Sequence, residues 1–212
     1  MTELIYYQDQ YKKELEAKVV SVEGNYALLD KTIFIPQTNT EPGDFGKING
    51  MKIAGSKKDG NNIWHIFSKP VSFKAGGTVK LELDWSKRLL AIRMHSALHL
   101  LAGAIEKNFG KRAVAGAVKG NQAELVLKEQ LPDETITRAI EASNKDIESS
   151  LEIKSYWDEK REGFRWTQIG EYPPIPDGGI HVKNTKEIGN LILVGKELND
   201  GKQKIIIGIN QE

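Results

Sequence analysis

Two histidines, His95 and His99, stand four residues apart in an apolar stretch that spans residues 89–105. Apolar residues recur there at helical spacing and no proline interrupts them, so the pattern predicts a helix over residues 86–109. Side chains four residues apart lie on one face of a helix, one turn from each other. The spacing therefore places two imidazoles side by side, and adjacent neutral imidazoles are a common start of a zinc site.

A second segment, Asp177-Gly178-Gly179-Ile180-His181, carries a carboxylate and an imidazole. Its glycines and the prolines before it exclude a helix, so a loop is predicted. A loop-borne pair that faces a helix-borne pair is a common way to build a tetrahedral zinc site. Two interpretations of Asp177 stay open: a metal ligand, or a carboxylate that accepts hydrogen bonds from the amides of a tight turn. The glycine amides could likewise bind an oxyanion or only form the turn.

The composition limits the class of protein. A chain of 212 residues can form one large domain or two small ones. The absence of cysteine excludes disulfides, thiolate zinc sites and cysteine nucleophiles. A net charge of +1 makes no global electrostatic case for nucleic acid, although a local basic patch remains possible. The N-terminus does not resemble a signal peptide and no apolar run could span a bilayer, so we expect a soluble, cytoplasmic protein.

Residues 1–84 are predicted to form a first domain of short strands separated by turn residues. Such punctuation is typical of a small antiparallel β-barrel or sandwich. The remaining histidine of the chain, His65, lies in this domain. It stands among aromatic residues in a strand-like run and is predicted to be a partly buried strand residue. The expected strands are 15–22, 26–29, 32–35, 47–54, 62–67 and 78–83, with a loop over 37–46 and a turn over 57–61.

Residues 85–212 are predicted to form a second domain that mixes helices and strands, so the chain is assigned to the α+β class. Asp84 or Ser86 is the expected cap of the first helix. A proline followed by acidic residues predicts a second helix from residue 132 to about residue 149. The expected strands are 113–118, 123–127, 151–157, 190–194 and 204–209, whereas residues 158–165 are too polar to assign.

Several motifs occur together along nearly the whole chain. They are Leu29-Asp30-Lys31-Thr32-x-Phe34-x-Pro36, Leu83-Asp84-Trp85, Arg93-Met94-His95-Ser96, His95-x-x-x-His99 and Asp177-Gly178-Gly179-Ile180-His181-Val182-Lys183-Asn184-Thr185. The combination resembles the alanyl-tRNA editing proteins called AlaX, free-standing relatives of the editing domain of alanyl-tRNA synthetase. The length matches the longer free-standing form. The resemblance implies a small N-terminal β-barrel followed by an α+β editing domain.

The resemblance also implies an activity, which is hydrolysis in trans of the ester bond of mischarged seryl- or glycyl-tRNA of the alanine set. A zinc ion is the implied cofactor, and the acceptor end of aminoacyl-tRNA is the implied partner, with no membrane and no obligate protein partner. The implied metal ligands are His95, His99, Asp177 and His181, of which the histidines are also catalytic. The implied contacts to substrate or tRNA are Arg93, Gly178, Gly179, Ile180 and Lys183. Further cations that could meet phosphates, or remain solvated surface charges, are Lys107, Lys111, Arg112, Lys119 and Lys186.

The sequence departs from the family pattern at three places. Asp177 stands where the family has cysteine, which keeps an anionic ligand but exchanges soft sulfur for hard oxygen. Ile180 stands where the family has threonine, so we hypothesise weaker selectivity for serine. The glycine-rich barrel loop is replaced by Gln37-Thr38-Asn39-Thr40. Two alternatives therefore stay open: a tRNA-binding module of the same fold with an altered metal site, or a metal-dependent hydrolase of another small ester.

Overall fold

A computed structural model describes residues 1–210, and the chain divides into two compact units, Met1–Leu89 and Leu90–Glu212. The predicted α+β class is confirmed, because the described residues combine α-helices with several sheets. The elements of the first unit are β1 (Glu3–Leu4), η1 (Ile5–Tyr7), β2 (Glu14–Glu23), β3 (Tyr26–Leu29), β4 (Lys31–Thr32), β5 (Gly46–Ile48), β6 (Met51–Asp59), β7 (Asn62–Phe67), β8 (Thr78–Leu83) and the first residues of α1 (Trp85–Phe109).

The second unit contains the rest of α1 and the remaining elements of the chain. They are β9 (Ala113–Lys119), β10 (Gln122–Leu127), α2 (Asp133–Glu148), β11 (Ile153–Trp157), β12 (Arg165–Ile169), β13 (Ile175–Pro176), η2 (Thr185–Glu187), β14 (Leu191–Asn199) and β15 (Lys202–Ile209). Among residues 1–210, no helix is both long enough and apolar enough to cross a membrane.

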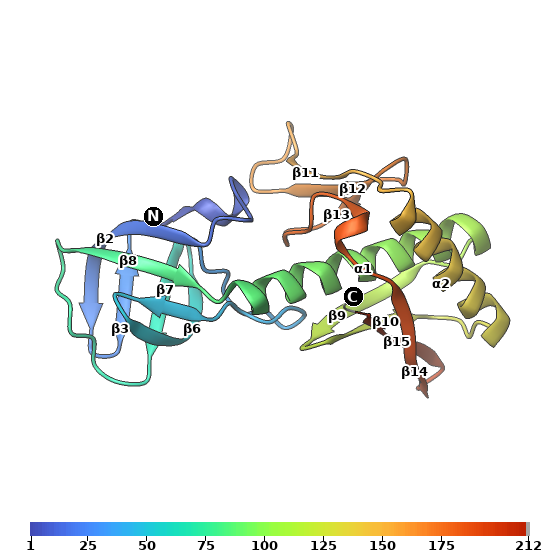
Figure 1. Ribbon diagram of the computed structural model, residues 1–212, viewed down its shortest axis with the longest axis horizontal. Coiled ribbons are helices and arrows are strands. Elements are labelled where there is room, and N and C mark those ends of the chain that lie inside the picture. Colours follow the sequence, from blue (N-terminus) through green and yellow to red (C-terminus); the bar gives the residue numbers. More distant parts are fainter. Residues whose placement is uncertain (211–212) are drawn as a thin grey trace. The chain divides into compact units, whose positions relative to one another are not determined.

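Six strands of the first unit form a closed barrel in the order β2-β3-β7-β6-β5-β8 (Figure 1). Neighbouring strands are antiparallel, and alternate side chains point into the barrel. Closure pairs every strand on both sides, so the barrel needs no other element to cover a sheet edge. The buried core includes Ala17, Val19, Ala27, Leu29, Ile48, Phe67 and Leu81.

Two predicted strands of the first domain are wrong. Of residues 32–35 only Thr32 lies in a strand, the two-residue β4, which pairs with β1 outside the barrel. Residues 47–54 do not form a single strand, because Asn49 and Gly50 adopt positive φ angles of 49° and 80° and turn the chain back. The turn joins β5 to β6 as a tight hairpin, for which an Asn-Gly pair is a strong signal. Apolar alternation continues on both sides of the turn, which is why the pattern read as one strand.

Both predicted helices are confirmed. The first was expected over residues 86–109 and is α1, and the second was expected over residues 132–149 and is α2. Asp84 precedes α1, and its Oδ1 atom accepts hydrogen bonds from the hydroxyl of Ser86 (2.7 Å) and the amide of Lys87 (3.4 Å). Asp84, rather than Ser86, therefore caps the helix.

An ion pair lies buried in the first unit between Arg88, in the first turns of α1, and Asp44. Arg88 Nε donates to Asp44 Oδ1 at 2.7 Å, and its Nη2 atom contacts the second carboxylate oxygen. The same guanidinium donates to the carbonyls of Ile33 (2.6 Å) and Gln10 (3.1 Å). A buried charge is tolerated only when it is paired and hydrogen-bonded in this way, so these contacts hold the start of α1 against the barrel loops.

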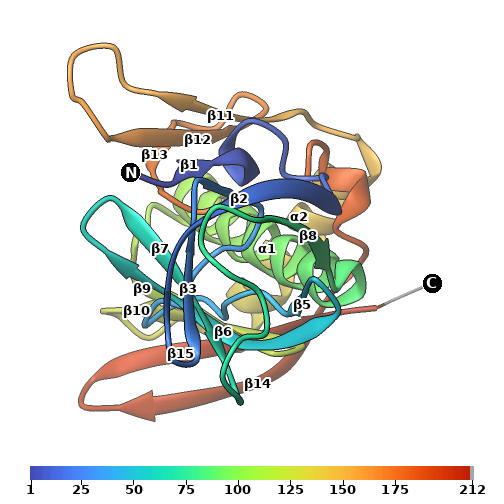
Figure 2. The same cartoon turned by 90° about the vertical axis from the view of Figure 1, so that its left-hand side faces the viewer.

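In the second unit α1 lies between two sheets (Figures 1 and 2). One sheet has the strand order β14-β15-β10-β9 and the other β11-β12-β13. Leu98 of α1 packs directly on Gly116 of β9, where an added Cβ would come within 2.6 Å of the leucine Cδ2 atom. Strands β12 and β13 were not predicted. They border the site that the helix histidines face.

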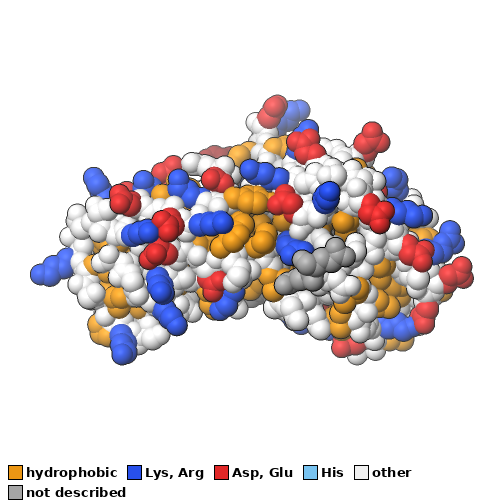
Figure 3. Space-filling view, in the orientation of Figure 1, with side chains coloured by type: hydrophobic (Ala, Val, Ile, Leu, Met, Phe, Trp, Pro, Cys, Tyr) orange, Lys and Arg blue, Asp and Glu red, His pale blue; other side chains and the backbone are white. Residues whose placement is uncertain are grey.

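Charged side chains of both signs are interspersed on the face drawn in Figure 3. This distribution agrees with the net charge of +1 and with 30 basic and 29 acidic residues in the chain. Any attraction for a phosphate backbone must therefore arise from local groups.

We predict that Asp44→Ala lowers the free energy of unfolding of the first unit by about 3–5 kcal/mol, because it leaves the buried Arg88 guanidinium without its partner. Urea denaturation measures the change. The matched control is Glu82→Ala, which removes an exposed carboxylate of β8 that pairs with Lys80 and should cost less than about 1 kcal/mol. Equal losses in the two variants would contradict the prediction.

A second prediction concerns His65 of β7, which is fully buried, with its Nε2 atom 2.8 Å from the hydroxyl of Thr32. Burial lowers the pKa of His65 from 6.5 to about 4. As the pH falls below 6.5, His65 binds a proton in the unfolded chain but stays neutral in the folded chain. The contribution of neutral His65 to the free energy of unfolding is therefore present above pH 6.5 and lost as the pH falls towards 4.

Lowering the pH from 7 to 5 should reduce the free energy of unfolding by about 2 kcal/mol through this histidine. His65→Gln should lose that part of the pH dependence in urea denaturation at the two pH values. The interpretation fails if the difference in stability between the variant and the wild-type protein is the same at pH 7 and pH 5.

Candidate metal centre

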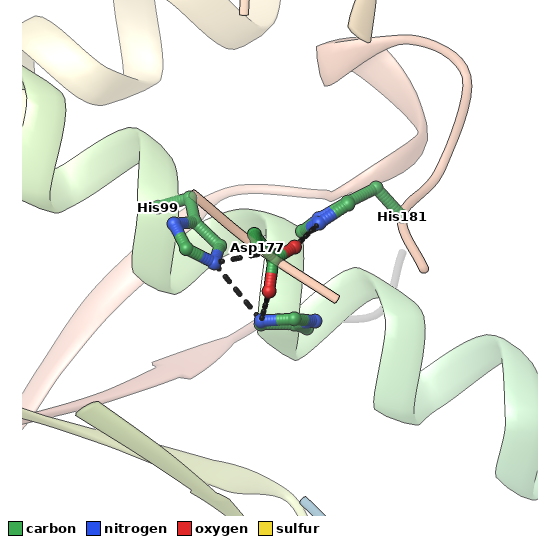
Figure 4. Close-up of side chains that lie close together, drawn as sticks. His99, Asp177 and His181 are labelled. Carbon is green, nitrogen blue, oxygen red and sulfur yellow. Dashed lines mark hydrogen bonds and ion pairs between the residues drawn. The ribbon is translucent and has the colours of Figure 1, made fainter. Parts of the chain in front are cut away.

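Four side chains of the second unit converge, with their candidate ligand atoms all within 4.8 Å of one another. His95 and His99 project from α1, and Asp177 and His181 project from the loop that follows β13 (Figure 4). The Nε2 atoms of the two helix histidines are 2.9 Å apart. The carboxylate of Asp177 lies 2.5 Å from His181 Nε2, 3.7 Å from His95 Nε2 and 3.8 Å from His99 Nε2. The structure thus brings together all four residues that were predicted as metal ligands.

Ser96 lies at the centre of this arrangement. Its hydroxyl donates its single proton to the Ile92 carbonyl at 2.7 Å and accepts a hydrogen bond from the amide of Val182 at 3.1 Å. His181 Nδ1 is 3.3 Å from the same oxygen, and its Nε2 atom is 2.5 Å from Asp177 Oδ2. Ser96 therefore connects α1 to the loop that carries His181, and the four converging side chains could hold a metal ion.

The electrostatic environment keeps these ligands in the required protonation states. Burial, and then the neighbouring histidines, hold the pKa of His99 well below 6.5, and the same effects lower the pKa of His181 to about 4. Burial by itself would raise the pKa of Asp177, but contact with His181 and the fields of the three histidines hold it well below its usual value. At neutral pH the imidazoles of His99 and His181 are neutral and Asp177 is an anion, as metal ligation requires.

The position of Asp177 is compatible with both roles that the sequence left open. Its Oδ1 atom accepts a hydrogen bond from the Gly179 amide at 3.1 Å, which closes the turn, while its carboxylate faces the histidines. The hydroxyl of Thr167, on β12, donates to Oδ2 at 3.4 Å. Arg165, also on β12, donates from Nη1 to the Gly179 carbonyl at 2.8 Å. The Gly179 amide is therefore hydrogen-bonded within the turn, and two side chains of strand β12 bind the loop that carries Asp177.

A cavity of about 630 Å³ adjoins the cluster: its lining includes His99 of the cluster and Thr167, which contacts Asp177. Tyr172 forms part of its wall. The Tyr172 hydroxyl donates to Asp146 Oδ2 at 2.5 Å, and its ring packs so closely on α1 that a Cβ added to Gly103 would lie 3.1 Å from it. Most of the remaining lining is apolar and includes Leu98, Ala102, Val114, Ala115, Leu125, Ile169 and Pro173 to Pro176. The polar cluster therefore lies beside a largely apolar cavity.

The other predicted contact residues occupy different environments. Gly178 and Lys183 are exposed on either side of His181 in the sequence. Ile180 is buried and is not among the residues that line the cavity. Arg93 is half-buried, and its Nε atom donates to the carbonyl of Ile188 at 2.8 Å. Arg93 thus connects α1 to the segment after the metal loop, and its contact with RNA stays a prediction.

The predicted basic cluster is divided. Lys107 and Arg112 line the cavity, where Arg112 forms an ion pair with Glu106. Lys111 and Lys119 form ion pairs with Glu129 and Glu124 respectively. Lys186 is exposed, next to η2. Only the first two cations therefore lie beside the candidate site.

Four residues of the site were not identified from the sequence: Ser96, Arg165, Thr167 and Tyr172. Ser96 follows His95 and belongs to a motif that was noted, but a buried serine carries no signal of its own. Arg165 and Thr167 are buried and alternate with half-buried positions, which is a strand pattern, although the polar residues before them obscured it. Their closeness to Asp177 depends on strand pairing that sequence spacing does not report.

The chain is similar to known proteins over almost its whole length. It is 35% identical over 212 residues to the alanyl-tRNA editing protein AlaX-M of Pyrococcus horikoshii, with 97% of this chain and 96% of that protein aligned. It is 34% identical to AlaX-M of Saccharolobus solfataricus, with 95% of each aligned. It is also 30% identical to the alanine–tRNA ligase of Methanococcus aeolicus, where 96% of this chain matches only 25% of the ligase. No protein-family model matches the chain.

The fold, the four-residue cluster and these similarities define a class of proteins that share an editing module with alanine–tRNA ligases. Within that class the chain belongs to the AlaX family of alanyl-tRNA editing proteins, which confirms the resemblance drawn from its motifs. Membership also confirms that the chain is an enzyme.

We predict that Ser96→Ala lowers metal affinity by about 10- to 100-fold, because Ser96 orients His181 and anchors the loop through the Val182 amide. Competition with a chromogenic chelator for Zn²⁺ measures the affinity. Ser143→Ala is the matched control, since Ser143 is an equally buried helix serine that donates to the carbonyl of Ala139 on α2. A similar loss of affinity in both variants would show a general effect of removing a buried hydroxyl instead.

Proposed function

We propose that the chain hydrolyses, in trans, the ester bond of mischarged seryl- or glycyl-tRNA of the alanine set, with a zinc ion held by His95, His99, Asp177 and His181. The observation that carries the proposal is the position of the cluster, which shares His99 with a cavity of about 630 Å³. The AlaX-M relatives are alanyl-tRNA editing proteins, which supports an editing reaction on aminoacyl-tRNA.

The donor set suits zinc. Three imidazole nitrogens and one carboxylate oxygen are ordinary ligands of a tetrahedral zinc ion, and ligand atoms at about 2.1 Å from such an ion are about 3.4 Å from one another. The four measured separations, from 2.5 Å to 3.8 Å, bracket that value. A binding module that had lost its metal site would not be expected to retain four converging ligands. The enzymatic interpretation is therefore favoured over that alternative.

Zinc, when bound, would polarise an ester carbonyl or lower the pKa of water to about 7. The remaining steps depend on the side chains. Ser96 and Thr167 orient His181 and Asp177, so that these ligands need not rearrange during turnover. The apolar cavity walls exclude bulk water from the ester and strengthen the electrostatic interactions inside. His99 stands at the boundary between cluster and cavity, so the reacting ester is placed next to it.

A separate hydrolase of this kind has a physical rationale. Serine and glycine differ from alanine by one hydroxyl or one methyl group, and a pocket distinguishes such differences by only about 1–3 kcal/mol. A second site that hydrolyses incorrect esters adds a further step of discrimination. The burial of Ile180 away from the cavity lining gives no support to the hypothesis that this residue weakens selectivity for serine.

The acceptor end of the RNA must lie close to the cluster for this reaction. Lys183 is exposed two residues after His181, and Lys107 and Arg112 line the cavity. We assign these three cations to the phosphates of the acceptor end. Binding that depends on such contacts weakens steeply as the salt concentration rises.

We predict that the wild-type protein hydrolyses seryl- or glycyl-tRNA of the alanine set and spares correctly charged alanyl-tRNA. A chelator should abolish the activity and added Zn²⁺ should restore it. His181→Asn should lower kcat about a hundredfold or more, because it removes a proposed metal ligand that Ser96 orients. Release of labelled amino acid from each tRNA measures the rates.

The control is His65→Gln, which removes a buried histidine of the first unit and should leave the deacylation rate unchanged at neutral pH. Absence of hydrolysis of all the mischarged tRNAs by the zinc-loaded wild-type protein would reject the proposed function. Hydrolysis that resists the chelator would reject the metal dependence alone.

A further inference from the structure

The hairpin of β11 and β12 carries two tryptophans in different environments. Trp166 is held in place, because its indole N–H donates to Asp158 Oδ2 at 2.7 Å and its ring packs edge-on against Phe164. Trp157, paired with Arg165 across the hairpin, has 50% of its surface exposed. The fold therefore buries only part of this large aromatic side chain, and half of it remains available to a partner.

The exposed indole is connected to the candidate metal centre through one guanidinium. Arg165 lies with its Cζ atom 5.1 Å from the centroid of the Trp157 ring and donates to the carbonyl of Gly179 at 2.8 Å. Gly179 in turn donates its amide to Asp177. The chain of contacts runs from the surface aromatic to a candidate metal ligand without leaving the second unit.

The register of the hairpin places the Trp157–Arg165 pair close to the candidate metal ligand Asp177. Trp157 and Arg165 form one cross-strand pair, and Ser155 and Thr167 form the next pair on the same face, with their hydroxyls 2.9 Å apart. Residues two apart in a strand are separated by about 6.6 Å. Thr167 contacts Asp177, so the Trp157–Arg165 pair lies one position along the same face from the pair that contacts the candidate metal ligand.

The chemistry of the surface fits unpaired nucleotides. A half-exposed indole offers a stacking face to a base, and the Arg165 guanidinium holds the indole through a cation–π contact. The backbone carbonyl of Lys183 accepts a hydrogen bond from the amide of Ile153, which joins the start of β11 to the segment after the metal loop. In Figure 2 the loop that joins β11 to β12 extends away from α1, so the hairpin is accessible within its unit.

We propose that Trp157 is a stacking platform for an unpaired base of the single-stranded 3′ end of RNA, a short distance before the nucleotide that carries the ester. Arg165 is the positioning residue that orients the indole and ties it to the metal loop. This inference rests on the proposed function for the identity of the RNA, but the stacking itself requires no aminoacyl group.

The test compares two uncharged RNA probes, a stem-loop with an unpaired 3′ tail and the same stem-loop without the tail. The wild-type protein should bind the tailed probe more tightly. Trp157→Ala should weaken binding of the tailed probe about tenfold and leave the tailless probe unaffected, whereas Trp157→Phe should retain most of the affinity. The zinc content of each variant verifies that the metal site is intact.

Tyr156→Ala is the matched control, because Tyr156 is the preceding residue of β11, is 41% exposed and points to the opposite face of the hairpin. It should change the affinity for neither probe. An unaltered affinity of Trp157→Ala for the tailed probe would overturn the inference, and is the result expected if the indole instead serves a protein partner.

The two proposals fail separately. Hydrolysis of mischarged tRNA by the wild-type protein together with normal RNA binding by Trp157→Ala would overturn the stacking role alone. Tail-dependent binding that requires Trp157, without hydrolysis of any aminoacyl-tRNA, would support the stacking role and reject the proposed function. Equal binding of both probes by the wild-type protein would overturn the stacking role.

Discussion

The hydroxyl of Ser96 joins the two parts of the candidate metal centre, and the geometry of the site depends on it. The helix histidines are held rigidly, because α1 is packed between two sheets. Asp177 and His181 lie on a loop without regular hydrogen bonding of its own. One oxygen atom binds that loop to the helix by accepting from the Val182 amide while it faces His181 Nδ1. The orientation of a ligand imidazole is usually set by such a partner.

The burial of four ionisable side chains is energetically costly, but it also sets the protonation states that cation binding requires. A buried polar group is expensive unless it is hydrogen-bonded, and a buried charge more so. The carboxylate of Asp177 is an anion that contacts the neutral imidazoles of His99 and His181. These polar contacts offset part of the cost of burial next to a largely apolar cavity. The same low-polarity surroundings strengthen the interaction of these ligands with a cation.

Asp177 shows how a family position can change without loss of the constellation. Where the resemblance to the family implies a thiolate, this chain has a carboxylate that both closes the turn through the Gly179 amide and faces the histidines. Thr167 and Arg165 of β12 hold this turn in place. The exchange keeps the negative charge of the ligand set, but makes its oxygen donor harder than sulfur.

The sequence by itself determined α1, α2, the histidine pair and most barrel strands, because periodicity and capping express contacts between residues close along the chain. It also placed Asp177 and His181 in one loop. Only the tertiary structure decided that this loop faces His95 and His99, that Ser96 connects them, and that β12 brings Thr167 and Arg165 beneath the turn. These contacts join segments up to 86 residues apart, and they are set by packing and strand register that no local pattern encodes.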